Sequence, residues 1–220
     1  MLILFRMIQF YLFFLSFLIS FNSDAKEIDT LEFIWVSDSI SGEFVEKAAI
    51  LIPVQFINDT NMYYFQFDSG ANFSSIYTGN PGKNEFNFKY AYSKTIETNI
   101  GSIEFDTLSN MYSFYEDDML VIGTIGANVF SDKILQIDFP NQRLIFSNEC
   151  HYENYNLIPI GQSFGRPTIQ LSIDSKKYEF LFDTGSCVFE MWTTKSIWKK
   201  LKRPKSLIVE KTIWSWGKQL

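Results

Sequence analysis

The residues most suited to chemistry are two aspartates that occupy matching places in an internal repeat. The sequences Phe-Asp-Ser-Gly-Ala at residues 67–71 and Phe-Asp-Thr-Gly-Ser at residues 182–186 lie 115 positions apart. The repeat extends upstream, so that residues 54–71 align with residues 169–186 without a gap. A single Asp-Ser/Thr-Gly occurs by chance in about one chain in ten of this length, and a β-turn capped by its Asp explains it. Two matched copies instead indicate a shared role for the two aspartates.

Carboxylates in this setting can act as an acid–base pair. Asp68 follows Phe-Gln-Phe and Asp183 follows Phe-Leu-Phe, so each carboxylate is expected at the buried end of an apolar strand. A buried charge there is costly unless it is paired or hydrogen-bonded. The Ser or Thr that follows supplies a hydroxyl, and the Gly allows a tight turn. If the two turns face each other, the carboxylates cannot both ionise easily and will share a proton.

The elements that must position these turns are short β-strands. From Lys26 onward the sequence shows short apolar or alternating runs broken by Gly, Asn, Asp and Pro, rather than helical periodicity. The segments that we expect to form strands are 44–57, 62–67, 75–77, 85–92, 102–108, 119–122, 133–138, 143–147, 168–173, 178–182, 188–192 and 207–214. Residues 58–61 and 140–142 are typical of hairpin turns, and residues 194–202 favour one short helix. The sequence therefore predicts an all-β chain made of two copies of one β-unit, with a junction near residues 150–157.

The two repeated turns resemble the active-site turns of the pepsin-like and retropepsin-like aspartic proteases, and look closest to the short bacterial relatives of pepsin. A third motif supports this resemblance. Gly-Thr-Ile-Gly-Ala-Asn-Val-Phe at residues 123–130 is similar to the apolar-apolar-Gly strand that passes the catalytic turn in this family, with Thr124 in place of a second aliphatic residue. The resemblance covers about residues 44–217. It implies a pepsin-like acid protease barrel, with a first lobe over residues 40–150 and a partial second lobe over residues 155–220.

The resemblance also implies an activity, that of an aspartic endopeptidase acting on peptide or protein substrates. Asp68 and Asp183 would hold a water molecule, one as general base while the other, protonated, donates to the carbonyl oxygen of the scissile bond. The positions that would brace or support the two turns are Ser69, Gly70, Thr184, Gly185, Ile125 and Gly126. The substrate would lie extended beneath a flap hairpin within residues 86–103, with Tyr90 or Tyr92 as its aromatic tip. Such a site needs no cofactor and no metal.

The second copy of the repeat is shorter than the first. The first unit runs from Asp68 to Phe146, whereas 37 residues follow Asp183 in this chain of 220, with no second apolar-apolar-Gly motif among them. Three alternatives stay open: the chain is a fragment of a longer protease, it completes the second lobe by dimerising, or it is a catalytically inactive peptide-binding protein on the same fold. A separate homodimer hypothesis pairs Asp68 of one copy with Asp68 of another, as in the retroviral proteases.

The N-terminal segment is typical of a secretory signal. Residues 1–25 carry a positive residue, then an apolar run over residues 7–21, then small residues at positions −3 and −1 of a cleavage site. The run is short for a membrane span, and an uncleaved signal anchor is the alternative. We therefore expect an exported chain, periplasmic or extracellular, that meets a membrane only if residues 7–21 are retained. A disulfide between Cys150 and Cys187 is allowed there, with two separate thiols as the alternative.

Composition argues against several other functions. The chain is 46% hydrophobic and 20% charged with a net charge of −6, and it has no Lys/Arg block. These values favour a folded domain without a nucleic-acid partner. The single histidine, His151, argues against a zinc site built from histidines and against a His-based triad, and it leaves a cysteine nucleophile only one conceivable base. The tryptophans at residues 192, 198, 214 and 216 are expected to pack in the core or between the lobes rather than to line a ligand site.

Overall fold

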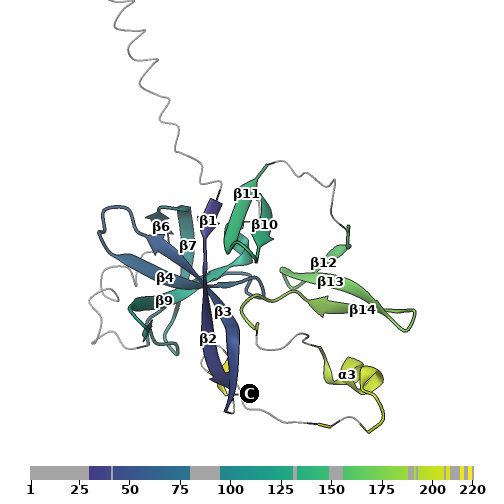
Figure 1. The fold of residues 1–220 in the computed structure, drawn as a ribbon. Helices are drawn as coiled ribbons and strands as arrows, with labels where there is room; N and C mark the ends of the chain where they lie inside the picture. Colours follow the sequence, from purple (N-terminus) through teal and green to yellow (C-terminus); the bar gives the residue numbers. More distant parts are fainter. Residues whose placement is uncertain are drawn as a thin grey trace, which may run out of the picture.

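The computed structural model describes residues 30–40, 42–79, 95–130, 133–148, 156–187, 191, 193–205, 207–208, 214–215 and 218–219. Strands dominate these residues, which confirms the predicted all-β class. The largest sheet has eight strands: Ile34–Ile40 (β2), Glu43–Gln55 (β3), Met62–Asp68 (β4), Ser74–Tyr77 (β5), Thr95–Thr98 (β6), Gly101–Leu108 (β7), Phe114–Glu116 (β8) and Met119–Gly126 (β9). They follow the order β2-β3-β4-β9-β5-β7-β6, and β8 pairs with β9 (Figure 1).

Strand β9 is the element that positions the first aspartate. It lies between β4 and β5 and pairs with β4 in parallel, with Phe67 opposite Ile125 and Asp68 opposite Gly126. It also pairs with β5 in the antiparallel sense. Strand β9 is therefore paired on both sides, and the end of β4 is paired with it.

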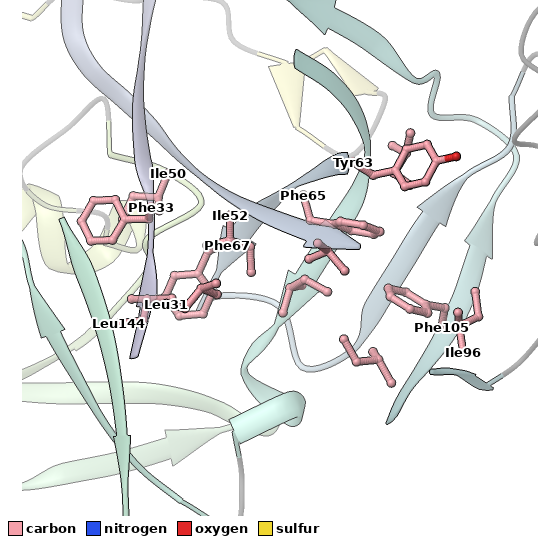
Figure 2. Close-up of a cluster of buried hydrophobic side chains, with 14 of the residues drawn as sticks. Leu31, Phe33, Ile50, Ile52, Tyr63, Phe65, Phe67, Ile96, Phe105 and Leu144 are labelled. Atoms are coloured by element: carbon pink, nitrogen blue, oxygen red, sulfur yellow. The ribbon is translucent and has the colours of Figure 1, made fainter. Parts of the chain in front are cut away.

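The core beneath this sheet is aromatic, as Figure 2 shows for the side chains around β3 and β4. Burial alternates along β4, where Tyr63, Phe65 and Phe67 face the core while Gln66 is half-buried. The Phe65 ring stacks on Phe105 with the ring centroids 5.4 Å apart. Burial of one such side chain stabilises the fold by about 2–3 kcal/mol. The strand that carries Asp68 thus rests on a well-packed apolar layer.

The remaining elements form smaller units. A three-stranded sheet consists of Thr30–Glu32 (β1), Arg143–Ser147 (β11) and Ile134–Asp138 (β10), and the 3₁₀ helix Ala127–Phe130 (η1) follows β9. A second three-stranded sheet consists of Ile160–Ser163 (β12), Arg166–Ile173 (β13) and Lys176–Leu181 (β14), and it stands to the right of the eight-stranded sheet in Figure 1. The chain continues through Lys195–Leu201 (α3), Trp214–Ser215 (β15) and Lys218–Gln219 (β16).

Most predicted strands form where the sequence indicates. The strand predicted at 143–147 has those bounds, and β3, β4, β5, β7, β10, β13 and β14 differ from their predictions by a few residues. Strand β9 reaches Gly126, four residues beyond the prediction, because pairing with β4 and β5 outweighs the low strand propensity of its glycines. Strands β1, β2, β6, β8, β12 and β16 were not among the predicted strands. All of them except β2 are runs of two to four residues, which carry too little periodicity.

Three expectations near the ends of the described chain need comment. The short helix is confirmed as α3, and the Thr194 hydroxyl caps it by accepting the Ile197 N–H. The core placement of Trp198 is wrong, because the side chain is 37% exposed and the Lys202 ammonium lies 5.0 Å from its ring centroid. Residues 207–208 are not in a strand, contrary to the strand predicted over 207–214.

Several expectations fall outside the described residues. They concern the signal segment at 1–25, the strand at 85–92, Cys150, His151 and the two candidate flap tyrosines Tyr90 and Tyr92. Within the described part of the chain, no helix has the length and apolar character needed to cross a membrane.

Candidate active site

Two tight turns bring Asp68 and Asp183 together. Strand β4 ends at Asp68, and Asp183 follows β14 after one residue. Asp68 is buried, with 8% of its surface exposed, whereas Asp183 is half-buried. A Cβ atom on Gly70 would lie 2.5 Å from the carboxyl carbon of Asp183, and one on Gly185 would overlap the carboxyl group of Asp68. Glycine therefore lets each turn lie against the opposite carboxylate.

Reciprocal hydrogen bonds join the two turns. The Ser69 N–H donates to Thr184 Oγ1 and the Thr184 N–H donates to Ser69 Oγ, each over 2.9 Å. Each hydroxyl then donates to a backbone carbonyl of the other half, Ser69 to Phe182 at 2.9 Å and Thr184 to Phe67 at 3.0 Å. The four bonds form two pairs, and the 115-residue offset of the repeat converts one bond of each pair into the other, which gives the two turns a local two-fold symmetry. They hold the two turns together through the buried side chains of Ser69 and Thr184.

The first turn has further support from its own half. Gly126 lies opposite Asp68 in the parallel register, next to the fully buried Ile125. The Ala127 N–H donates to the Ala71 carbonyl over 2.9 Å, which closes the turn against the end of β9. Ile125 and Gly126, which the sequence singled out, therefore lie on the strand next to Asp68, opposite Phe67 and Asp68 themselves.

The second turn is supported differently. Among the described residues β14 pairs with β13 and with no other strand. The Gly185 N–H donates to Asp183 Oδ1 over 2.9 Å, and the Gln66 side chain reaches across from β4 to donate Nε2–H to the Gly185 carbonyl over 3.0 Å. The sequence analysis did not single out Gln66. The available signal was an amide between two buried phenylalanines, where the matched position of the repeat has Leu181.

The electrostatics of the pair are unequal. Burial, followed by the charge of Asp183 and a side-chain hydrogen bond with it, raises the pKa of Asp68 from 3.8 to about 7. The backbone N–H groups of Gly70 and Ala71 act in the opposite direction. Asp68 Oδ1 is buried without a hydrogen-bond partner among the described residues. Asp68 is therefore the group that retains a proton in mildly acidic solution.

Two neighbouring acids stay protonated at neutral pH. Burial raises the pKa of Tyr77 to about 12, although its 2.6 Å hydrogen bond with the Thr124 hydroxyl lowers it. Burial, followed by the charges of Asp183 and Asp68, raises the pKa of the Cys187 thiol to about 11. Cys187 is a free cysteine that donates to the Thr184 carbonyl, so it is neither in a disulfide nor a ready thiolate nucleophile.

An apolar cavity opens beside the pair. It has a volume of about 310 Å³ and reaches Asp183 at one side. Its lining comes from both halves of the chain and includes Trp35, Phe139, Leu171, Phe180 and Met191. Apolar walls beside a few polar groups are the usual setting of a binding site.

The structure thus gathers most of the residues singled out from the sequence. Six lie at the contact between the turns (Asp68, Ser69, Gly70, Asp183, Thr184 and Gly185), and Ile125 and Gly126 lie behind the first turn. Within the described ranges, no group of three or more His, Cys, Asp or Glu side chains could hold a metal ion. No family model, curated protein or solved structure matches the chain.

Proposed function

We propose that the chain is an aspartic endopeptidase that hydrolyses peptide bonds with a water molecule activated between Asp68 and Asp183. The observation that carries this proposal is the contact of two carboxyl groups across two hydrogen-bonded glycine turns. Two carboxyl groups in contact titrate as a pair, and one of them keeps its proton where the other is ionised. A proton donor and a proton acceptor side by side are what amide hydrolysis requires.

The proposal gives the two carboxyl groups different starting roles. Asp68 carries the proton because burial and its neighbour raise its pKa, and Asp183, which accepts the Gly185 N–H, acts as the base. Asp183 takes a proton from water as the oxygen attacks the carbonyl carbon, and Asp68 donates its proton to the carbonyl oxygen. The resulting gem-diol collapses as Asp183 protonates the amide nitrogen, the C–N bond breaks, and Asp68 recovers a proton from a diol hydroxyl.

The proposal is tested with the full chain and a fluorogenic peptide library between pH 3 and 8. We expect cleavage that declines as pH rises through about 7, because Asp68 then loses its proton. A statine-type transition-state mimic should inhibit it, and both Asp68→Asn and Asp183→Asn should abolish it. Asp106→Asn, on an exposed position of β7, is the matched control and should cleave like the parent. Cleavage that survives Asp68→Asn would overturn the proposal.

A second candidate, an inactive peptide-binding protein, draws on the weaker support of the second turn. Asp183 is half-buried, and β14 is an end strand among the described residues. This candidate predicts that extended peptides bind with the same affinity in the parent and in Asp68→Asn, and that the parent cleaves none of them. The homodimer hypothesis remains a prediction, and activity that rises with the square of protein concentration would support it. Export and the nature of the substrate stay proposals as well.

A further inference from the structure

The turn that carries Asp183 depends on a contact that the turn carrying Asp68 does not have. Gln66 lies two residues before Asp68, on the face of β4 opposite to the buried Phe65 and Phe67. Its amide donates to the Gly185 carbonyl over 3.0 Å. Applying the 115-residue offset of the repeat to this bond gives a bond from position 181 to Gly70, and position 181 is a leucine.

Gly185 is the residue through which this contact can act on both carboxyl groups. Its N–H donates to Asp183 Oδ1, and its Cα lies so close to the Asp68 carboxyl that a Cβ would overlap it. Its carbonyl is the group that Gln66 holds. One residue, through the two peptide groups on either side of its Cα, therefore connects the Gln66 amide, the Asp183 carboxylate and the packing surface of Asp68.

The repeat has no equivalent bond on the other side. The position matched to Gln66 is Leu181, whose side chain cannot donate a hydrogen bond to the Gly70 carbonyl. The first turn instead has β9 behind it, with Gly126 in register with Asp68. The two turns thus have different supports, backbone pairing for the first and a side-chain amide from the opposite half for the second.

We infer that Gln66 is a positioning residue, which holds the Gly185 carbonyl and thereby keeps the Gly185 N–H directed at the Asp183 carboxylate. The consequence of this inference for catalysis rests on the proposed function, whereas the hydrogen bond between Gln66 and Gly185 is independent of it. Without the Gln66 amide the turn that carries Asp183 can rotate, and the hydrogen bond from the Gly185 N–H to the Asp183 carboxylate lengthens. The ionised form of the carboxyl pair then loses a donor that stabilises it. Misplacement of a reacting group by a fraction of an ångström is enough to slow a reaction without changing substrate binding.

The test compares Gln66→Leu with a matched control, Gln55→Leu. Gln55 is also a half-buried strand glutamine, and its Nε2 donates to the Asp59 carbonyl over 3.0 Å, at the other end of β4 from the aspartates. Both variants lose one side-chain-to-backbone hydrogen bond, so their melting temperatures should fall alike. The titration of Asp68 and Asp183 is followed through the carboxyl ¹³C chemical shifts of labelled aspartate as a function of pH, a measurement that needs no turnover.

In Gln66→Leu the lower apparent pKa of the carboxyl pair should rise by about half a unit or more, and the Gly185 amide should exchange with solvent faster. The kcat should fall about ten-fold with KM within about two-fold, a pattern that a general loss of stability does not produce. Gln55→Leu should leave both the titration and kcat unchanged. A titration of the pair in Gln66→Leu that matches the parent would overturn the inference.

The outcomes separate the inference from the proposed function. If the parent cleaves no peptide but the titration still shifts in Gln66→Leu, the protease proposal fails and the positioning role stands. If the parent cleaves peptides and Gln66→Leu matches it in kcat and in titration, the protease proposal stands and the positioning role fails.

Discussion

The raised pKa of Asp68 makes a prediction about stability that does not depend on any catalytic activity. A carboxyl group whose pKa is higher in the folded state binds its proton more tightly there than in the unfolded chain. Folding is then favoured at low pH, and this contribution is lost as pH rises from the unfolded value of 3.8 to the folded value of about 7. The shift of roughly three units corresponds to about 4 kcal/mol.

The perturbation is Asp68→Asn, which keeps the shape of the side chain and removes the titration. The free energy of unfolding, measured by urea denaturation, is compared for parent and variant at pH 4 and pH 8. Between pH 4 and pH 8, the free energy of unfolding of Asp68→Asn should rise by about 4 kcal/mol relative to that of the parent. The reason is that only the parent has a buried carboxyl group that must ionise at pH 8. The exposed-site variant Asp106→Asn should show no comparable change.

A difference between parent and Asp68→Asn that stays constant within about 1 kcal/mol from pH 4 to pH 8 would refute the argument. It would mean that Asp68 is hydrated or is paired with a cation in the native protein. The reasoning from two facing carboxyl groups would then lose its electrostatic basis.

Three further predictions concern the turns. Ser69→Ala and Thr184→Ala should each lower the free energy of unfolding by about 2 kcal/mol or more, because each leaves buried backbone groups without partners. In a double-mutant cycle measured by urea denaturation, the loss in the double variant should differ clearly from the sum of the two single losses. Gly70→Ala should destabilise the fold and remove the proposed peptide cleavage, because its Cβ would meet the carboxyl group of Asp183; a melting temperature equal to that of the parent would contradict the packing. The Cys187 thiol should react with iodoacetamide much more slowly in the folded than in the denatured protein at pH 8, as followed by mass spectrometry, because its pKa is raised to about 11.

The sequence was most informative where two levels of pattern agreed. Alternation of apolar residues predicted β4 and β14, and the repeat predicted that both strands end in equivalent turns. The bracing of one turn against the other was an implication of the resemblance to the aspartic proteases, and the hydroxyls of Ser69 and Thr184 form reciprocal bonds between the turns. The glycines were the sharpest signal, since each is needed for the approach of the opposite carboxyl group.

Local patterns were least informative where pairing decides the structure. Thr124 lacks an obvious place in an apolar-apolar-Gly motif, yet its hydroxyl bonds to the buried Tyr77 side chain, a partner 47 residues away. Tyr77 and Thr124 lie too far apart for a single sequence window to contain both. Strand β6 pairs with the neighbouring β7 in a local hairpin, and its burial alternates, but its four residues are too few for the alternation to be recognised in the sequence.

The repeat itself explains why Gln66 escaped notice. A repeat directs attention to positions where the two copies agree, and at this position they differ, with an amide in one and leucine in the other. Yet two copies that face each other across a pseudo-two-fold axis share one site, and a position at which the copies differ gives the two carboxyl groups unlike neighbours. Two carboxyl groups in contact share one proton even in matching surroundings, and unlike neighbours decide which group holds it. The structure supplies unlike surroundings through the depth of Asp68 and through the amide that Gln66 directs at the opposite turn. The positions at which the repeat is broken are therefore the ones where differences between the two aspartates should be sought.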